Sequence, residues 1–294
     1  MVGRNLLETS DTGVEVVAPT RSELDVTDAA AVRRAVEASR ADLVIHAAGR
    51  VGGIAANMAA PAAFLADNLR MGLAVLEAAS TVGIRCLNLA SSCIYPPEAT
   101  NPLREDALLT GGLEPTNEGY ALAKLSVLRM GQYLNRMSGS VQIKSLVPCN
   151  LYGRHDHFDS QAGHMIPAVV LKIHEAKRAG SDVEIWGDGK ARREFLLAKD
   201  AARMIWYAAS HFDALPDVMN IGLGTDYSVL DYYEAIAKAV GWTGLYTFNL
   251  DRPVGMKRKL VDVSHQLRLG FPPVSSLEQG LAETYNFFLE SSAA

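Results

Sequence analysis

The first half of the 294-residue chain alternates short apolar runs with longer stretches of helical periodicity. We predict strands at the apolar runs and helices between them; the runs are 14–18, 42–47, 84–90 and 141–148, and the helical stretches are 29–39, 61–82 and 119–137. Strands that alternate with helices form βαβ units, which assemble into a parallel sheet with helices on its faces. The pattern therefore predicts an α/β fold with a Rossmann-like, doubly wound parallel sheet.

The start of the chain departs from this pattern. A dinucleotide fold normally opens with a strand, a glycine-rich turn and a helix whose N-terminus receives the pyrophosphate. Residues 1–8 already read as that helix, and Gly3 alone could be the last glycine of the turn. We expect that the first strand and the glycine turn are missing, because a predicted strand begins at Val14, where the strand after the first helix of such a fold is expected. The alternative is an ordinary N-terminal helix.

The second half of the chain is less regular. Residues 153–195 place His, Asp, Arg and Gly in loops around one predicted helix at 166–178, and further helices are predicted at 199–212, 228–240 and 277–290. We therefore divide the chain into a nucleotide-binding domain, 1–152, and a smaller lobe, 153–294, that covers a substrate cleft. Some segments of this lobe are expected to cross back to the sheet.

Composition restricts the partners of the chain. The net charge is −5 with no long basic run, so a nucleic acid is not an expected partner. No apolar stretch reaches about 18 residues and no signal peptide is evident, so no membrane association is expected. The three cysteines lack the spacing of metal ligands, so no metal site is predicted, and they fit a reducing cytoplasm.

Three side chains suit carbonyl reduction. Ser91 follows the apolar run 84–90, so it should lie at the C-terminal edge of a parallel strand, where open α/β sheets bind ligands. Tyr120 and Lys124 are four residues apart and share one face of a predicted helix. An ammonium near a phenol lowers the pKa of the phenol, which can then protonate a carbonyl oxygen. Tyr-x-x-x-Lys alone could be a solvated helix face, but together with Ser91 it predicts reduction with a nicotinamide cofactor.

With these residues in place, the chain resembles the GDP-L-fucose synthases, a family of extended short-chain dehydrogenase/reductases. The matching motifs extend over nearly the whole chain and include Ser-Ser-Cys-Ile-Tyr-Pro and Glu-Pro-Thr-Asn-Glu; they are 51–54, 91–96, 113–118, 120–124, 150–153, 155–156, 186–187, 193–196 and 258–263. Departures from the family pattern are Gly49 and Arg50 before Val-Gly-Gly, and Gly119 before Tyr120.

The resemblance implies a set of catalytic residues. Ser91 would bind the C4 carbonyl oxygen, Tyr120 would donate the proton, and Lys124 would tune Tyr120 and hold the nicotinamide ribose. The base and acid that epimerise C3 and C5 correspond to Cys93 and His164. Cys93 lies on a strand-end loop where a positive neighbour would lower the pKa of its thiol; alternatively it is a small buried filler. His164 could instead cap a helix or lie on the surface.

The resemblance also implies binding residues and NADP(H) as the cofactor. An acidic residue that would select NAD is absent after the strand at 14–18, where Arg21 occurs, although some family members have a further Arg at the position of Pro19. The implied cofactor-binding residues are Gly3, Arg21, Asp25, Ala47, Ala48, Tyr120, Lys124, Asn150, Leu151 and His164, and those for the GDP-sugar are Trp186, Arg193 and Lys259. Asp25 could instead be a turn residue. Arg193 and Lys259 could instead form ordinary surface ion pairs, and Trp186 could instead pack in the core.

The family implies NADPH-dependent 3,5-epimerisation and 4-reduction of a GDP-linked 4-keto-6-deoxy sugar, GDP-4-keto-6-deoxy-D-mannose, to GDP-L-fucose. Two alternatives stay open: a related GDP-dideoxyhexose or GDP-heptose epimerase/reductase, and a truncated, non-catalytic relative. The resemblance further implies a homodimer formed through the helices at 61–82 and 119–137.

Overall fold

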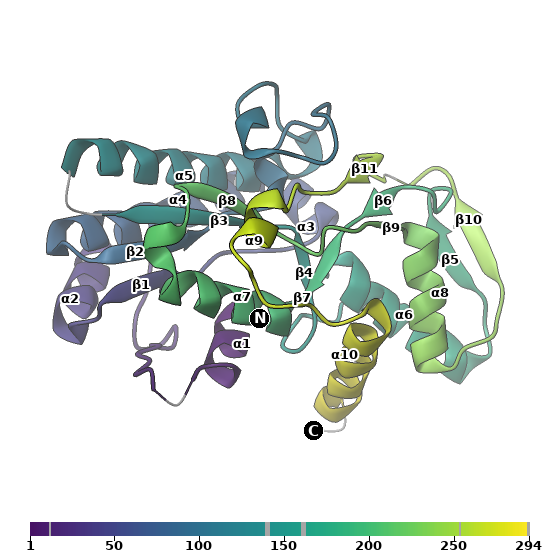
Figure 1. The fold of residues 1–294 in the computed structure, drawn as a ribbon. Helices are drawn as coiled ribbons and strands as arrows, with labels where there is room; N and C mark the ends of the chain where they lie inside the picture. Colours follow the sequence, from purple (N-terminus) through teal and green to yellow (C-terminus); the bar gives the residue numbers. More distant parts are fainter. Residues whose placement is uncertain (12, 139–141, 160–162, 253, 293–294) are drawn as a thin grey trace.

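A four-stranded parallel sheet forms the centre of the computed structural model, which describes residues 1–11, 13–138, 142–159, 163–252 and 254–292 (Figure 1). Its strands lie in the order β1-β2-β3-β8. They are β1 (Leu43–His46), β2 (Arg85–Leu89), β3 (Ile143–Pro148) and β8 (Val218–Ile221). This arrangement confirms the predicted α/β fold with a parallel sheet, and β8 shows that a late segment of the chain returns to it.

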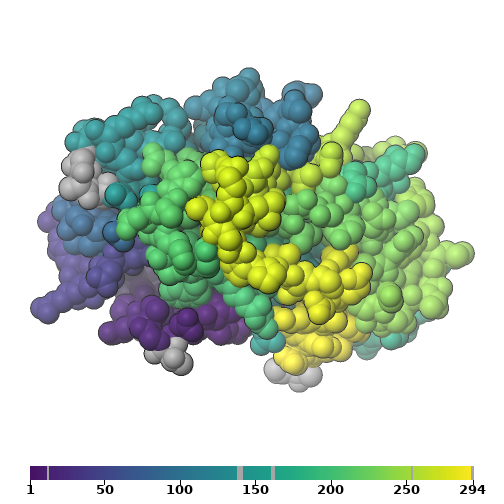
Figure 2. Space-filling model, viewed as in Figure 1, coloured from purple at the N-terminus to yellow at the C-terminus, as the bar shows by residue number. Residues whose placement is uncertain are grey.

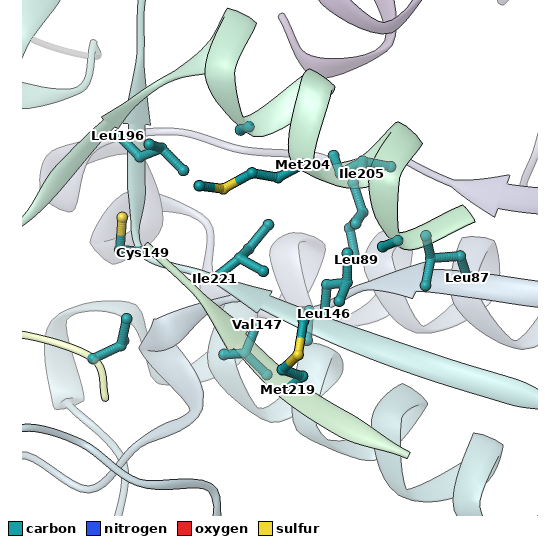
Figure 3. Packing of buried hydrophobic residues seen from close by; sticks show 14 of the residues in the cluster. Leu87, Leu89, Leu146, Val147, Cys149, Leu196, Met204, Ile205, Met219 and Ile221 are labelled. Atoms are coloured by element: carbon teal, nitrogen blue, oxygen red, sulfur yellow. The ribbon is translucent and has the colours of Figure 1, made fainter. Parts of the chain in front are cut away.

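Helices cover both faces of the sheet (Figure 1). The helices are α2 (Ala29–Ser39), α4 (Pro61–Val82) and α5 (Glu118–Ser138) on one face, and α1 (Val2–Glu8) and α7 (Ala198–Ser210) on the other. Successive strand residues point to opposite faces: Cys86 packs with residues of α4 and α5, whereas Leu87 and Leu89 pack with Ile205 of α7 (Figure 3).

Local signals set the ends of two helices where the sequence predicts them. The Asp28 carboxylate accepts hydrogen bonds from the backbone N–H groups of Ala30 and Ala31 at 2.9 and 3.0 Å, which caps α2. Pro61 occupies the first position of α4, and Gly83 ends that helix with a left-handed φ of 84°. The predicted ranges 29–39 and 61–82 are therefore confirmed.

The two long helices approach each other closely at Gly72 of α4 and Val127 of α5. A Cβ atom at position 72 would lie 2.3 Å from Val127 Cγ2, well inside van der Waals contact. Gly72 thus lets α4 and α5 approach each other closely at this point.

The predicted strand at 14–18 is wrong. This segment has no regular secondary structure, and Val14 and Val17 are exposed. A strand persists only when its backbone N–H and C=O groups have a partner. In the part of the chain that the structure describes, β1 is an edge strand that pairs only with β2, and no strand pairs with 14–18. The predicted strand at 141–148 begins at Ile143, and residue 141 lies outside the described ranges.

The rest of the chain builds a second hydrophobic cluster beside the sheet. Its strands form three small sheets, and its elements are β4 (Asn150–Tyr152), α6 (Met165–Ala179), β5 (Val183–Trp186), β6 (Arg192–Arg193), β7 (Phe195–Leu197), β9 (Tyr227–Ser228), α8 (Val229–Val240), β10 (Tyr246–Asn249), β11 (Arg258–Lys259) and α10 (Leu277–Ser292). The short helices are α3 (Ile54–Ala59) and α9 (Ser264–Arg268), and the 3₁₀ turns are η1 (Ser92–Ile94), η2 (Glu105–Ala107), η3 (Pro115–Asn117) and η4 (Phe212–Ala214).

The C-terminal segment joins the two parts. In Figures 1 and 2 it passes from α9, next to the central sheet, to α10 beside the second cluster. The division at residue 152 stays a prediction, and the core around the sheet includes residues from beyond it, such as Met204, Met219 and Val261. Among the described residues, no helix has the length and apolar character needed to cross a lipid bilayer.

Candidate active site

Ser91 and Cys93 lie where β2 ends. The backbone leaves the strand after Leu89 and turns into η1, and the Ser91 hydroxyl accepts a hydrogen bond from the Cys93 N–H at 3.3 Å. This contact caps the turn and keeps both side chains at the C-terminal edge of the sheet. Ser91 thus occupies the strand-end position predicted from the sequence, the edge where open α/β sheets bind ligands.

Tyr120 and Lys124 lie on the first two turns of α5. Lys124 is only 6% exposed; its Nζ donates a hydrogen bond of 2.9 Å to the Leu89 carbonyl oxygen and lies 6.0 Å from the centre of the Tyr120 ring. Burial lowers the pKa of Lys124 to about 8, so near neutral pH the group is still mostly protonated. The ammonium therefore ties α5 to the end of β2, with Tyr120 one turn away.

The expected lowering of the Tyr120 pKa is wrong. Burial raises the pKa of Tyr120 above its ordinary value of 10.0, the neighbouring Cys93 acts in the same direction, and a hydrogen bond with Ser91 opposes both. The phenol is therefore protonated near neutral pH. This is the form required to give a proton to a carbonyl oxygen, so the chemical role predicted for Tyr120 does not depend on a lowered pKa.

Cys93 has polar partners from two other segments. Lys259 Nζ lies 3.3 Å from the Cys93 sulfur, and Asn117 Nδ2 lies 3.5 Å from it. Burial by itself would raise the pKa of the thiol, but the Lys259 ammonium and the hydrogen bonds from Ser91 and Lys259 outweigh burial, so the pKa lies below its ordinary value; Glu114 acts weakly in the raising direction. In contrast, burial raises the pKa of the other thiols, Cys86 and Cys149.

His164 precedes α6 and faces a buried carboxylate. Its Nδ1 lies 3.5 Å from Asp156 Oδ1, and the Asp156 side chain is 6% exposed. The second carboxylate oxygen, Oδ2, is buried and has no hydrogen-bond partner among the described residues. Asp156 can therefore orient the His164 ring, as carboxylates orient imidazoles in acid–base sites.

A second buried carboxylate, Glu194, connects three segments beneath the site. It accepts backbone hydrogen bonds from Gly224 at 2.7 Å and from Val261 at 2.9 Å. Burial raises its pKa to about 7 although these hydrogen bonds favour the ionised form. A Cβ atom at Gly222 would lie 2.4 Å from Glu194 Oε1, so position 222 has no room for a side chain.

One cavity of about 510 Å³ contains most of the predicted site residues. Its lining includes the predicted residues Gly3, Ala47, Ala48, Ser91, Cys93, Tyr120, Lys124, Asn150, Leu151, His164, Trp186, Arg193 and Lys259. Arg21 and Asp25 are exposed and are not part of this lining. The Asp25 carboxylate accepts hydrogen bonds from the N–H and the hydroxyl of Thr27, which is the geometry of a turn residue. The roles of all these residues stay predictions.

The wall of the cavity beside Lys124 fits a nicotinamide cofactor. Ala47, Ala48 and Gly49 line this wall with almost no side-chain volume. A Cβ atom at Gly49 would lie 3.2 Å from Asn68 Oδ1 and 3.7 Å from Lys124 Nζ, so it would fill the space over the ammonium. Small residues next to a buried ammonium leave room for a flat ring and a ribose, whose hydroxyls could accept from Nζ.

Sequence reasoning missed several residues of the site. Asn117 and Asp156 belong to the matching motifs, but no role was assigned to either. Glu114 and Lys172 also line the cavity, and Lys172 Nζ lies 5.9 Å from the Trp186 ring. A polar residue within a matching motif was the available signal for Asn117 and Asp156, whereas nothing in the sequence distinguishes Lys172 from a surface lysine.

Comparisons with known proteins show the family to which the chain belongs. The model of the "NAD dependent epimerase/dehydratase family" matches residues 1–222. A GDP-L-fucose synthase of Azorhizobium caulinodans is 45% identical over 98% of this chain and 93% of that protein. A GDP-L-colitose synthase of Yersinia pseudotuberculosis is 44% identical over 98% of this chain and 95% of that protein.

A solved structure shares the fold. The GDP-L-fucose synthetase of Naegleria fowleri bound to NADP has a TM-score of 0.90 and 26% identity, over all of this chain and 92% of that one. The chain therefore belongs to the NAD dependent epimerase/dehydratase family and, within it, to the group that contains the GDP-L-fucose and GDP-L-colitose synthases.

Proposed function

We propose that this chain catalyses the NADPH-dependent 3,5-epimerisation and 4-reduction of GDP-4-keto-6-deoxy-D-mannose to GDP-L-fucose. The observation that carries the proposal is that two sets of acid–base groups line one cavity: Ser91 with Tyr120, and Cys93 with His164. Reduction needs one proton donor for the C4 oxygen, and epimerisation needs a base and an acid at carbons next to it. A single bound sugar can use both sets.

Reduction requires a proton at the C4 oxygen. When bound, NADPH supplies the hydride, and Ala47, Ala48 and Lys124 would hold its nicotinamide end. The Ser91 hydroxyl donates a hydrogen bond to the ketone oxygen and the Tyr120 hydroxyl gives that oxygen its proton. Because burial keeps the Tyr120 phenol protonated, the donor is ready in the resting protein.

Epimerisation requires a base and an acid on opposite faces of the sugar. The Cys93 sulfur takes the proton from the carbon next to the ketone, and the electron pair moves to the C4 oxygen as an enolate. The His164 imidazolium then returns a proton to the other face, with its ring oriented by Asp156. The thiol pKa below its ordinary value raises the ionised fraction of Cys93 at neutral pH.

The GDP part of the substrate has candidate partners on the far side of the cavity. Arg193 suits a diphosphate, and the exposed face of Trp186 suits a base or sugar ring. The Arg252 guanidinium carbon already lies 5.0 Å from the Trp186 ring centre, which adds a positive charge beside it. Lys259, which the resemblance assigns to the GDP-sugar, lies in contact with Cys93.

A second function is favoured by the relative from Yersinia pseudotuberculosis, whose name specifies GDP-L-colitose. The same residues would act on a GDP-linked 4-keto-3,6-dideoxy sugar, with epimerisation at C5 alone. A GDP-6-OMe-4-keto-L-xylo-heptose reductase of C. jejuni, at 28% identity and a TM-score of 0.90, represents the heptose alternative.

The test is to incubate the purified chain with GDP-4-keto-6-deoxy-D-mannose and NADPH and to identify the product by chromatography and NMR. The expected product is GDP-L-fucose, with one NADPH consumed for each product molecule. The 3-deoxy and heptose 4-ketones are run in parallel under the same conditions. Preferred turnover of either one would assign the alternative substrate, and no turnover of any ketone with cofactor bound would support the non-catalytic alternative.

We further propose that the enzyme acts in the cytoplasm, where its free cysteines remain reduced, and that it forms a homodimer through α4 and α5. The support for the dimer is a set of exposed side chains on α5 that includes Leu122, Tyr133 and Met137. Sedimentation equilibrium of the purified chain tests the dimer, and a monomer at micromolar concentration would contradict it.

A further inference from the structure

We propose that Lys259 is a positioning residue for epimerisation, whose ammonium holds Cys93 as a thiolate in the substrate-free protein. This inference deepens the proposed function and rests on it for its catalytic meaning. It assigns Lys259 to the reacting end of the sugar, whereas the resemblance assigns it to the GDP-sugar without reference to the thiol.

The contact between the two groups is direct. Lys259 Nζ lies 3.3 Å from the Cys93 sulfur, and Asn117 Nδ2 approaches the same sulfur at 3.5 Å. Both neighbours are donors, and neither can accept a hydrogen bond through these nitrogens. A thiolate accepts from both donors more strongly than a neutral thiol does, so this environment favours the ionised form.

The charge of Lys259 also requires a counter-charge. Lys259 is 8% exposed, and among the described residues no carboxylate lies within 4.0 Å of its ammonium. The neighbouring residue across the β11–β6 ladder is Arg193, another cation. A buried charge without a partner is costly. The Cys93 thiolate is the anion that meets this need at contact distance.

The backbone fixes the ammonium in place. β11 pairs with β6 on one side, the Leu260 N–H donates to Asn101 Oδ1 at 2.9 Å, and the Val261 N–H donates to Glu194 Oε2 at 2.9 Å. Both residues that follow Lys259 are thus held by buried or half-buried partners. These backbone hydrogen bonds hold Lys259 beside a thiol 166 positions away in the sequence.

Every proton in the epimerisation step is accounted for. In the resting protein the thiol proton has passed to water, leaving thiolate and ammonium. On substrate binding the thiolate accepts the proton from the carbon next to the ketone and becomes a neutral thiol, while the electron pair of the C–H bond moves to the C4 oxygen. The proton that His164 returns to the other face completes the inversion.

The experiment measures the rate of iodoacetamide alkylation of Cys93 against pH in the protein without substrate or cofactor. Other charged or titratable groups at the sulfur are Glu114, near η3, and Tyr120, on α5. Cys86 and Cys149 are buried with raised pKa values, and the Cys93→Ser variant defines any signal that they give. Lys257→Met is the matched control, because Lys257 is exposed and two residues away on the same segment.

The wild-type midpoint is expected below that of an unperturbed thiol, about pH 8.5. Lys259→Met is expected to move the midpoint up by about one unit or more, with a roughly tenfold slower reaction at neutral pH. Lys259→Arg should restore most of the shift, and Lys257→Met should behave as wild type. A midpoint in folded Lys259→Met that equals the wild-type value would overturn the proposal, as would loss of GDP affinity without any change in the thiol profile.

A second measurement separates this proposal from the proposed function. Solvent deuterium exchange at the carbons next to the ketone should fall in Lys259→Met at neutral pH and recover as the pH rises, because hydroxide then ionises the thiol. The alkylation profile needs no substrate. If Lys259→Met shifts the alkylation profile but the wild-type protein turns over no GDP-sugar, the ion pair is supported and the proposed function is rejected. If the profile does not shift but the wild-type protein turns over the GDP-sugar, the ion pair is rejected and the proposed function stands.

Discussion

The Lys124 ammonium donates a hydrogen bond of 2.9 Å to the carbonyl oxygen of Leu89, the last residue of β2. The bond fixes the start of α5 against the end of the strand that leads to Ser91. Tyr120 lies one helical turn before Lys124, so the same contact places the phenol beside the strand-end hydroxyl. A long-range contact thus assembles two groups that the sequence shows only as separate motifs.

Tyr120→Phe should abolish reduction, by a factor of about a hundred or more, because it removes the proton donor but keeps the ring. The measurement is the loss of NADPH absorbance with the 4-ketone substrate. Tyr133→Phe, on the same helix but 48% exposed, is the matched control and should have wild-type activity. Reduction at more than about a tenth of the wild-type rate in Tyr120→Phe would reject the assigned role.

Cys93→Ser should slow epimerisation much more than reduction, because a serine hydroxyl is far less acidic than the thiol and does not ionise at neutral pH. Solvent deuterium incorporation reports epimerisation, and turnover of a pre-epimerised 4-ketone reports reduction alone. Equal losses in the two measurements would refute the role of Cys93 as the base.

Asp156→Asn should slow epimerisation by about tenfold while reduction of the pre-epimerised ketone stays near wild type, because an amide holds the His164 ring less firmly than a carboxylate does. Asp188→Asn, at an exposed turn, is the control. If the rates of both half-reactions fall together in Asp156→Asn, the carboxylate stabilises the fold and does not act specifically on the His164 acid.

The Glu194 carboxyl should make the folded state less stable as pH rises from about 4.5 to 7. An unfolded Glu194 releases its proton near its ordinary value of 4.5, whereas the folded group holds it until about 7, so the folded state binds more protons within this window. Stability therefore falls with increasing pH, by at most about 3 kcal/mol from this group.

The measurement for Glu194 is urea unfolding at several pH values in wild type and Glu194→Gln, which cannot titrate. Between pH 4.5 and pH 7, the difference in unfolding free energy between the two proteins should change by about 2 kcal/mol. A difference that stays constant with pH would contradict the raised pKa.

Gly72→Ala should destabilise the protein by about 1–3 kcal/mol, because the added methyl group collides with Val127. The helix propensity of alanine opposes this by about 1 kcal/mol. The double variant Gly72→Ala/Val127→Ala should be less destabilised than the sum of the two single changes. Additive losses in the double variant would show that the two helices do not meet at these positions.

The elements that the sequence located best are those with local signals. Asp28 caps α2, and Pro61 and Gly83 delimit α4, so their bounds follow from nearby residues. The strand predicted at 14–18 had the right apolar pattern, but a strand also needs a neighbour. The identity of that neighbour depends on the whole sheet, and no local pattern reports it.

In the site, too, some features follow from the local sequence and others depend on tertiary packing. Residue types and spacing placed Ser91, Tyr120 and Lys124 together. The direction of the Tyr120 pKa shift was wrong because burial depth, which dominates it, is set by tertiary packing. The approach of Lys259 to Cys93 joins residues 166 positions apart, and no sequence spacing predicts that contact.

The fit of Glu194 against Gly222 limits how this family member can be redesigned. Any side chain at position 222 would displace the carboxylate, and a shorter residue at 194 would leave the N–H groups of Gly224 and Val261 without acceptors. A shorter side chain at 194 or any side chain at 222 would therefore each disrupt this contact, whereas Glu194→Gln keeps the length of the side chain. Libraries that alter sugar preference should therefore leave position 222 as glycine and keep a side chain of the length of glutamate at 194.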